Sequence, residues 1–297
     1  MGTTRVTDGE TIGGVVISNA RKVWWPDDGI TKGDIARYYL EVAPLLIPWM
    51  KDRPLTAERC PDGMLGGCFY RKNFPEGNIP VGAPRLRLRA ESTGKDVNYV
   101  VGGSLDALLG FVRVGCIAMH VMNSRVGSMH EADWLAFDLD PSSGEFADTV
   151  RAGQILRKVL DDENLVSFPK TSGSRGLHVF IPLRAGQSQD VVTGFAVRVG
   201  EELARREPEL VTMEWRKSAR GARVYADPFR NAYLQTIVTP YSVRRRPHAP
   251  VSTPLAWDEV SAKLDPAKFT IRTLGKRVAK ADPWSDFKRK AVRLPVS

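Results

Sequence analysis

Two aspartates one residue apart interrupt an apolar run in WLAFDLDPSSG, residues 134–144. The run is typical of a buried β-strand, in which side chains two positions apart point to the same face. Asp138 and Asp140 would then share one face, with their Cβ atoms roughly 6–7 Å apart. Because two like charges at that spacing repel each other and resist burial, the pattern indicates a positively charged partner there.

A third aspartate, Asp227, ends a second apolar segment, ARVYAD. Three carboxylates that converge at a sheet edge would bind two divalent cations, which stabilise the attacking and leaving oxygens in phosphoryl transfer. Oxygen ligands favour Mg²⁺ or Mn²⁺. The alternative is that each aspartate only caps a turn, as aspartates commonly do.

The segment TSGSRGLHV, residues 171–179, combines glycines with polar donors between two predicted strands. The glycines permit a tight turn and a close backbone approach. The donors that could cradle a triphosphate are Ser172, Ser174, Arg175 and His178. No Gly-Lys-Ser/Thr sequence follows, so the segment is not a Walker A loop. A hairpin turn that carries a solvated arginine is an equally open interpretation.

Basic and aromatic residues surround these motifs. They are Lys22 and Lys32 on either side of a Trp-Trp-Pro turn, Phe69 and Tyr70 before Arg71 and Lys72, Arg216, Lys217, Arg220 and Arg223 before the third aspartate, and Arg244, Arg245 and Arg246 after it. Basic groups bind phosphates, and exposed aromatic rings stack on bases. Taken singly, each is better explained as a solvated charge or a core side chain, and His120 by default as a core histidine. Their positions beside the aspartates favour the functional interpretation.

Composition favours a nucleic-acid partner and a reducing environment. The chain has 297 residues, 42% of them hydrophobic, and 43 Lys and Arg against 34 Asp and Glu give a net charge of +9. A basic protein favours a polyanion such as nucleic acid. From composition alone, a basic soluble protein without such a partner is an equally open interpretation. Three cysteines without a CxxC pair predict neither a disulfide framework nor a Cys-rich zinc site. Without a signal peptide or an apolar run of ~18 residues, we expect a soluble intracellular protein.

The elements that must position these residues are mixed strands and helices. Thr31 is the expected N-cap of a helix through DIARYYLEVAPLLIPWM, in which Pro44 predicts a kink or an early end. Further helices are expected at about 145–163 and 189–206, and strands at 85–90, 134–139, 165–170, 177–183 and 222–227. Such a mixture predicts an α/β or α+β core. We expect one domain, 1–297, with an N-terminal subdomain of about 1–130 packed on a catalytic core of about 131–297.

In this order the motifs resemble the polymerase domain of bacterial ATP-dependent DNA ligase D, within the archaeo-eukaryotic primase superfamily. The matching stretches, from about residue 15 to 285, are SNARKVWWPDDGITKGDIARYY, KDRPLTAERCPDG, CFYRKN, DWLAFDLDPS, TSGSRGLHVFIPL and ADPFRNAYLQTIVTPYSVRRRPHAPVSTPLAWDEV. The resemblance implies an α+β fold with a primase-like catalytic core: two packed β-sheets with flanking helices, a modified RNA-recognition-type fold. It also implies a cytoplasmic, nucleoid-associated bacterial enzyme of DNA repair.

The resemblance further implies roles for individual residues. Asp138, Asp140 and Asp227 would be the catalytic ligands of two metal ions, with Mn²⁺ favoured over Mg²⁺. The residues that would bind the incoming NTP or dNTP are His120, Ser172, Arg175, His178, Arg220 and Arg244. Those that would grip the 5′-phosphate beyond a DNA gap are Asn19, Lys22 and Lys32. Phe69 and Tyr70 match the position that stacks on the template.

Two residues depart from the family pattern: Arg175 stands where a lysine is usual, and Arg230 replaces a polar amide. The expected function is template-dependent nucleotide addition, with ribonucleotides preferred, at short gaps or broken DNA ends that carry a 5′-phosphate. Because the sequence contains no ligase or nuclease domain, the expected partners are a separate DNA ligase and the Ku end-binding protein of non-homologous end joining. The alternatives are a primase that starts chains de novo and a non-catalytic DNA-end binding module, against which the intact aspartate triad argues.

Overall fold

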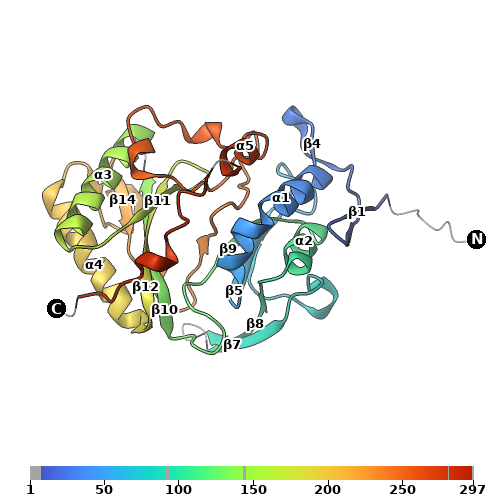
Figure 1. The fold of residues 1–297 in the computed structure, drawn as a ribbon, viewed down its shortest axis with the longest axis horizontal. Helices are drawn as coiled ribbons and strands as arrows, with labels where there is room; N and C mark the ends of the chain where they lie inside the picture. Colours follow the sequence, from blue (N-terminus) through green and yellow to red (C-terminus); the bar gives the residue numbers. More distant parts are fainter. Residues whose placement is uncertain (1–7, 91–93, 143–144, 280, 296–297) are drawn as a thin grey trace, which may run out of the picture.

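The fold is built on two larger β-sheets, each with helices packed against it (Figure 1). The structure, a computed structural model, describes residues 8–90, 94–142, 145–279 and 281–295. The helices are α1 (Lys32–Met50), α2 (Leu105–Arg113), α3 (Phe146–Asp162), α4 (Gln189–Arg206) and α5 (Leu274–Val278). The predicted α+β fold of packed sheets with flanking helices is confirmed. Within the described residues, no helix is both long and apolar enough to cross a membrane.

The first sheet comes mostly from the N-terminal half of the chain, in the order β15-β9-β5-β8-β7 with β6 paired to the end of β5. Its strands are β5 (Pro54–Arg59), β6 (Phe69–Arg71), β7 (Arg85–Ala90), β8 (Lys95–Val101), β9 (Cys116–Val121) and β15 (Ile237–Val238). α1 and α2 pack on it in one hydrophobic cluster. β15 belongs to the C-terminal half and ties the two halves together. The division into two subdomains of a single domain stays a prediction.

The second sheet has the order β11-β12-β10-β14-β13. Its strands are β10 (Glu131–Pro141), β11 (Phe168–Thr171), β12 (Leu177–Ser188), β13 (Val211–Thr212) and β14 (Val224–Asp227). All neighbouring strands are antiparallel except β13 and β14, which are parallel. α3 and α4 pack on this sheet in a second hydrophobic cluster.

Side-chain alternation along β10 decides what reaches the space between the sheets. Leu135, Phe137 and Leu139 pack with α3 and α4, whereas Trp134 and Ala136 join the cluster of the first sheet. The pairing of β10 with β12 is regular from Trp134 onward. Asp138 and Asp140 therefore continue the series of Trp134 and Ala136 and face the first sheet, as the i, i+2 spacing predicts.

Helix α1 begins as predicted but does not end early. Thr31 accepts a hydrogen bond from the backbone N–H of Asp34, whose carboxylate accepts from the N–H of Thr31, completing a capping box. Pro44 and Pro48 both lie inside the helix. Both are exposed, so water can solvate the carbonyls that lose a partner, while the opposite face of α1 is buried. Packing of that face outweighs the helix-breaking effect of proline.

Two short strand pairs precede α1. They are β1 (Glu10–Ile12) with β2 (Val15–Ile17), and β3 (Val23–Trp25) with β4 (Ile30–Thr31). The single-turn helix η1 (Pro26–Asp28) joins β3 to β4. This hairpin is the Trp-Trp-Pro turn, and it holds the two lysines at its ends close together because the Lys32 N–H donates to the carbonyl of Lys22.

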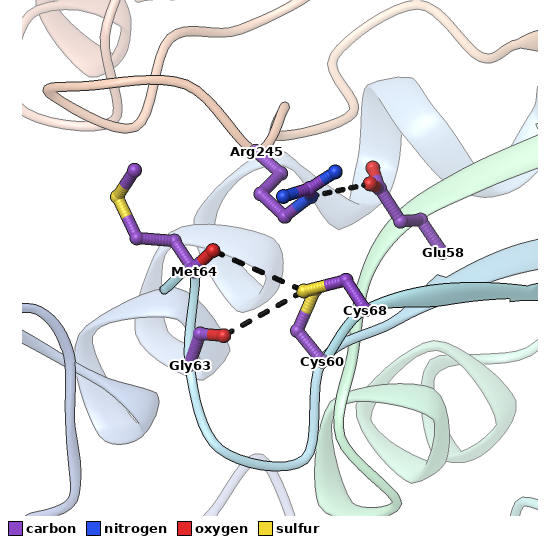
Figure 2. The surroundings of a disulfide bond; sticks show 6 residues. All are labelled: Glu58, Cys60, Gly63, Met64, Cys68 and Arg245. Atoms are coloured by element: carbon purple, nitrogen blue, oxygen red, sulfur yellow. Dashed lines mark hydrogen bonds and ion pairs between the residues drawn. A yellow bond between two sulfur atoms is a disulfide. The ribbon is translucent and has the colours of Figure 1, made fainter. Parts of the chain in front are cut away.

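The structure contains a Cys60–Cys68 disulfide, contrary to the prediction from cysteine count (Figure 2). Cys116 is a buried free thiol. The bridge closes the short loop CPDGMLGGC, whose proline and glycines let the chain fold back on itself, a local geometry that counting cysteines misses. Figure 2 shows the loop beside the ion pair in which Arg245 donates to Glu58 at 2.7 Å. The disulfide therefore joins the end of β5 to the start of β6, next to the C-terminal segment that carries the arginine run.

Candidate active site

A cavity of about 500 Å³ lies between the two sheets. The residues that line it are Thr56, Tyr70, Lys72, His120, Asp138, Asp140, Ser172, Ser174, His178, Arg230, Gln235, Thr236, Ile237, Val238, Arg244 and Arg246. We call it the aspartate cavity. A cavity of similar size between α1 and the C-terminal segment has mainly apolar and aromatic walls, among them Trp49 and Trp284. Its buried Arg53 is already ion-paired with Asp133.

The two most buried aspartates lie directly opposite each other on neighbouring strands. Asp138 of β10 pairs with Asp227 of β14 in the antiparallel register. Their side chains are 10% and 5% exposed, and the Nε atom of Arg230 lies 3.3 Å and 3.1 Å from their respective Oδ2 atoms. Arg230 is therefore the positively charged partner that the sequence pattern requires for these carboxylates. It is also one of the two residues that depart from the family pattern.

The electrostatics of the triad fit a divalent cation. Repulsion by Asp138, together with burial, raises the pKa of Asp140 to about 7. Burial opposes ionisation of Asp138, but His178 and Arg230 hold its pKa below the usual value. Buried Oδ1 of Asp138 has no aligned hydrogen-bond donor. Within the described residues no group of three His, Cys, Asp or Glu is already spaced as a metal site. The hard oxygen donors and their crowded charge nevertheless suit a divalent ion, which would take all three aspartates as ligands.

A buried lysine orients the histidine beside Asp138. Lys170, on β11, is fully buried, and its Nζ lies 2.8 Å from Nδ1 of His178 and donates to Ser252 Oγ. Burial lowers the pKa of His178 to about 4, so the imidazole is neutral near pH 7. Nδ1 then accepts from Lys170, and Nε2 carries the proton, 3.0 Å from Oδ1 of Asp138. Sequence reasoning missed Lys170; the signal was a lone lysine inside the apolar strand LVSFPK.

The turn after β11 brings its backbone close to the aspartates. Gly173 has φ +70°, and a Cβ there would lie 2.6 Å from Cγ of Arg244. A Cβ on Gly176 would lie 2.7 Å from Oδ1 of Asp140. Both glycines are therefore needed for close approach, as their spacing predicts. Ser172 Oγ accepts from the N–H groups of Ser174 and Gly176, and its carbonyl accepts from Arg244 at 2.9 Å.

Of the other predicted nucleotide-binding residues, His120 lines the aspartate cavity, whereas Arg175 and Arg220 lie outside its lining. His120 lines the aspartate cavity with its Nε2 buried and unpaired, so it is not the satisfied core histidine of the default interpretation. Burial lowers the pKa of His120 well below its usual value. Arg175 is exposed and outside the cavity lining. Arg220 is also outside it: it is buried, donates to the carbonyls of Glu214 and Trp215, and lies 3.6 Å from the Tyr225 ring centroid.

The two residues predicted to stack on the template, Phe69 and Tyr70, lie in different places. Tyr70 lines the aspartate cavity, and its ring meets His120 edge-on at 5.3 Å between centroids. Phe69 is 42% exposed and lies 6.0 Å and 5.1 Å from the guanidinium groups of Arg59 and Arg71. An exposed ring between two cations suits a base stacked beside its phosphates.

Lys22 and Lys32, with Asn19, form a second basic site that we call the lysine patch. Lys32 is buried and donates to the carbonyls of Ser18 and Arg113 at 2.9 and 2.7 Å. Burial, and then the charge of Lys22, lowers the pKa of Lys32 to about 8. Lys22 donates to the Pro61 carbonyl and to Asp62 in the disulfide loop. Exposed Asn19 begins the turn, with φ 54°.

The fold and the cavity define a nucleotidyltransferase of the primase-polymerase class. The family model described as "LigD, primase-polymerase domain" matches residues 31–284, and the chain belongs to this family. It is 31% identical over 252 residues to the multifunctional non-homologous end joining protein LigD of Mycolicibacterium smegmatis, covering 83% of this chain and 32% of that protein. It is 32% identical over 270 residues to the bifunctional LigD of Bacillus subtilis, covering 90% and 43%. The chain thus spans less than half of these relatives.

A solved structure has the same fold. The polymerase domain from Mycobacterium tuberculosis ligase D in complex with DNA superposes with a TM-score of 0.84 at 31% identity, covering 93% of this chain and 99% of that one. The resemblance to the ligase D polymerase domain inferred from the sequence is therefore confirmed. Members of this family carry out metal-dependent nucleotidyl transfer.

Proposed function

We propose that this protein adds nucleotides, with ribonucleotides preferred, to primer ends at short gaps or broken DNA ends that carry a 5′-phosphate. The observation that carries the proposal is the aspartate cavity, in which Asp138 and Asp140 face the same volume as Arg244 and Arg246. Carboxylates and cations are the two kinds of group that nucleotidyl transfer requires, for the metal-bound reacting oxygens and for the triphosphate respectively.

The residues of the cavity divide the work of the reaction. The primer 3′-oxygen attacks the α-phosphorus and pyrophosphate leaves. Two divalent ions, Mn²⁺ or Mg²⁺, held by the three aspartates would lower the pKa of the 3′-hydroxyl and neutralise the leaving group. Arg244, fixed by the Ser172 carbonyl, binds the triphosphate in a charge-assisted manner, and Ser172 and His178 lie beside it. The neutral His178 lies with Nε2 3.0 Å from Oδ1 of Asp138 without adding charge to the carboxylates.

The lysine patch is the proposed site for the 5′-phosphate on the far side of a gap. Lys32 has two carbonyl partners, so a terminal phosphate would be its first full negative charge. Trp25, in the turn between the two lysines, donates from Nε1 to the carbonyl of Arg246 at 2.7 Å. This bond connects the lysine patch to a residue that lines the aspartate cavity. A phosphate held at one site would therefore position the primer end relative to the other.

The physiological setting we propose is DNA repair by end joining. The supporting observation is that the relatives are named as non-homologous end joining proteins. A separate DNA ligase and the Ku end-binding protein are the proposed partners. The net charge of +9 is consistent with a DNA substrate.

The test is extension of a 5′-phosphorylated gapped duplex compared with a bare single strand, with Mn²⁺ and either NTPs or dNTPs. We expect extension of the gapped duplex, faster with NTPs, and none on the bare strand. Product from the unprimed strand at an equal rate would favour the primase alternative. No product from any substrate would favour the DNA-end binding alternative.

A further inference from the structure

The Arg230 guanidinium contacts one carboxylate oxygen of each of the two buried aspartates, Asp138 and Asp227. Its Nε atom is 3.1 Å from Oδ2 of Asp227 and 3.3 Å from Oδ2 of Asp138. The remaining oxygens face elsewhere: Oδ1 of Asp227 accepts from the N–H of Phe229, and Oδ1 of Asp138 lies beside His178. A cation that bridged Asp138 and Asp227 would therefore meet the Arg230 guanidinium already bound to an oxygen of each carboxylate.

The backbone of Arg230 is fixed, but its side chain reaches solvent. Arg230 lies in the single-turn helix η4 (Phe229–Asn231) directly after β14. The neighbouring Asn231 is fully buried; its side chain donates to the Ala136 carbonyl and accepts from the Ala136 N–H, which ties η4 to β10. The Arg230 side chain is 38% exposed and lines the aspartate cavity. A change of rotamer alone would therefore move its guanidinium off the carboxylates.

Whether the Arg230 guanidinium leaves the carboxylates depends on which charged ligands, a divalent cation or a polyphosphate, occupy the cavity. A guanidinium and a divalent ion repel each other when both lie against the same carboxylates, so they compete for the aspartate pair. A polyphosphate in the cavity offers Arg230 other anionic oxygens, in the bidentate geometry that arginine prefers. Arg244 and Arg246 line the same cavity, so such a ligand would be drawn there.

We propose that Arg230 is a latch that closes the Asp138–Asp227 pair to divalent cations until a polyphosphate draws its guanidinium away. This inference rests on the proposed function, because it assigns the aspartates to metal binding. Its consequence is positive coupling: the polyphosphate strengthens metal binding, and the metal strengthens polyphosphate binding by the same factor. The chain would thereby assemble its metal site only when a nucleotide is present.

The experiment is a Mn²⁺ titration of the whole chain, followed by the electron paramagnetic resonance signal of free Mn²⁺. Without polyphosphate, Arg230→Gln should bind Mn²⁺ about tenfold more tightly than wild type. The matched control is Arg246→Gln, which removes the same charge from the same cavity; its guanidinium donates to Ser174 Oγ and not to an aspartate. Inorganic triphosphate, with its own Mn²⁺ binding measured separately, should tighten binding to wild type and not to Arg230→Gln. Arg230→Lys, which keeps a charge without the planar fork, should give an intermediate affinity.

Asp138→Asn separates failure of the latch from failure of the proposed function. If wild type and Arg230→Gln bind Mn²⁺ with equal affinity and Asp138→Asn does not bind it, the latch is overturned and the metal site is supported. An equal gain in Arg246→Gln would also overturn it, because the effect would then be one of general charge. Absence of Asp138-dependent Mn²⁺ binding in every variant, with or without triphosphate, would overturn the metal site and the latch together. Thermal unfolding of each variant verifies that it is folded, and Arg230→Lys carries the comparison if Arg230→Gln is not.

Discussion

The aspartate cavity and the lysine patch both bury charge, but they neutralise it differently. At the cavity, Asp138 and the neighbouring Asp227, which lies outside the cavity lining, are balanced by the partly exposed Arg230 side chain. In the patch, Lys32 is balanced by two backbone carbonyls, and within the described residues no carboxylate pairs with it. Backbone dipoles solvate a charge without cancelling it. Under the proposal above, the cavity exchanges one cation for another. In the patch, Lys32 keeps a standing attraction for an anion, whereas Lys22 is already paired with Asp62.

The largest expected effect comes from removing the fixed charge of the cavity. Asp138→Ala or Asp140→Ala should reduce nucleotide addition by about 10³-fold or more, because a lost metal ligand removes several kcal/mol of transition-state stabilisation. Binding to gapped DNA should change little, since it depends on the basic surface. Single-turnover extension and DNA binding are measured side by side. Extension retained in either variant would contradict the two-metal assignment.

A smaller effect is expected at the cationic rim of the cavity. Arg244→Ala should weaken nucleotide binding by about one to two decades, since it removes charge-assisted bonds to the triphosphate. Arg175→Ala, at a predicted site outside the cavity lining, is the matched comparison and should have less effect. The apparent nucleotide affinity at saturating DNA distinguishes them. An unchanged affinity in Arg244→Ala would show that this arginine only fixes the Ser172 turn.

The lysine patch should change its charge near pH 8, about one pH unit above the value at which Asp140 of the cavity titrates. The pKa of Lys32 is lowered to about 8, so its charge, and with it the preference for a 5′-phosphate, is present below about pH 8 and is lost above. We expect the preference to fall about tenfold between about pH 7 and 9. Because the folded-state pKa lies below the usual 10.5, burial of the charged lysine lowers stability below about pH 8, and this penalty is relieved as the pH rises toward 10.5.

Lys32→Arg is the control for the pH effect, because an arginine stays charged throughout this range. Its preference should be independent of pH. A wild-type preference that stays constant from about pH 7 to 9 would show that Lys32 does not bind the phosphate.

The smallest effect is expected from the disulfide loop, which reaches the lysine patch through Lys22. Closing so short a loop stabilises a chain by roughly 2 kcal/mol. Cys60→Ser with Cys68→Ser should therefore lower the free energy of unfolding by about that amount and weaken the phosphate preference a few-fold. Nucleotide affinity should be unchanged. Equal stability of the double variant and the oxidised wild type would show that the bridge does not form in solution.

Local sequence patterns predicted the side of the cavity that carries Asp138, Asp140 and the Ser172 turn. They could not predict how Asp227 and Arg230 meet it. The i, i+2 spacing placed Asp138 and Asp140 on one face, and the glycines of the Ser172 turn indicated a close approach. The pairing of Asp138 with Asp227 is a register between strands nearly ninety residues apart. No short-range signal specifies such a register, so neither the pairing nor the position of Arg230 between the two carboxylates could be derived.

Three features that we predicted wrongly or missed from the sequence depend on tertiary structure. Helix α1 passes through Pro44 because its other face is buried against the first sheet. Helix α2 was not predicted, although Ser104 accepts from the N–H of Ala107 as an N-cap. Its apolar residues fit a buried strand as well as a helix, and periodicity does not separate the two over so short a run. The Cys60–Cys68 bridge depends on a loop geometry that composition does not report.

The most direct measurement is the ratio of extension rates on a gapped duplex with a 5′-phosphate and on the same duplex with a 5′-hydroxyl. It is made at low ionic strength, where exposed charges are least screened. Wild type should prefer the phosphate by about tenfold or more, and Lys22→Ala with Lys32→Ala should lose that preference while still extending a plain primer-template. Equal rates on the two gaps for wild type would contradict the proposal that the lysine patch directs the aspartate cavity to gaps and broken ends.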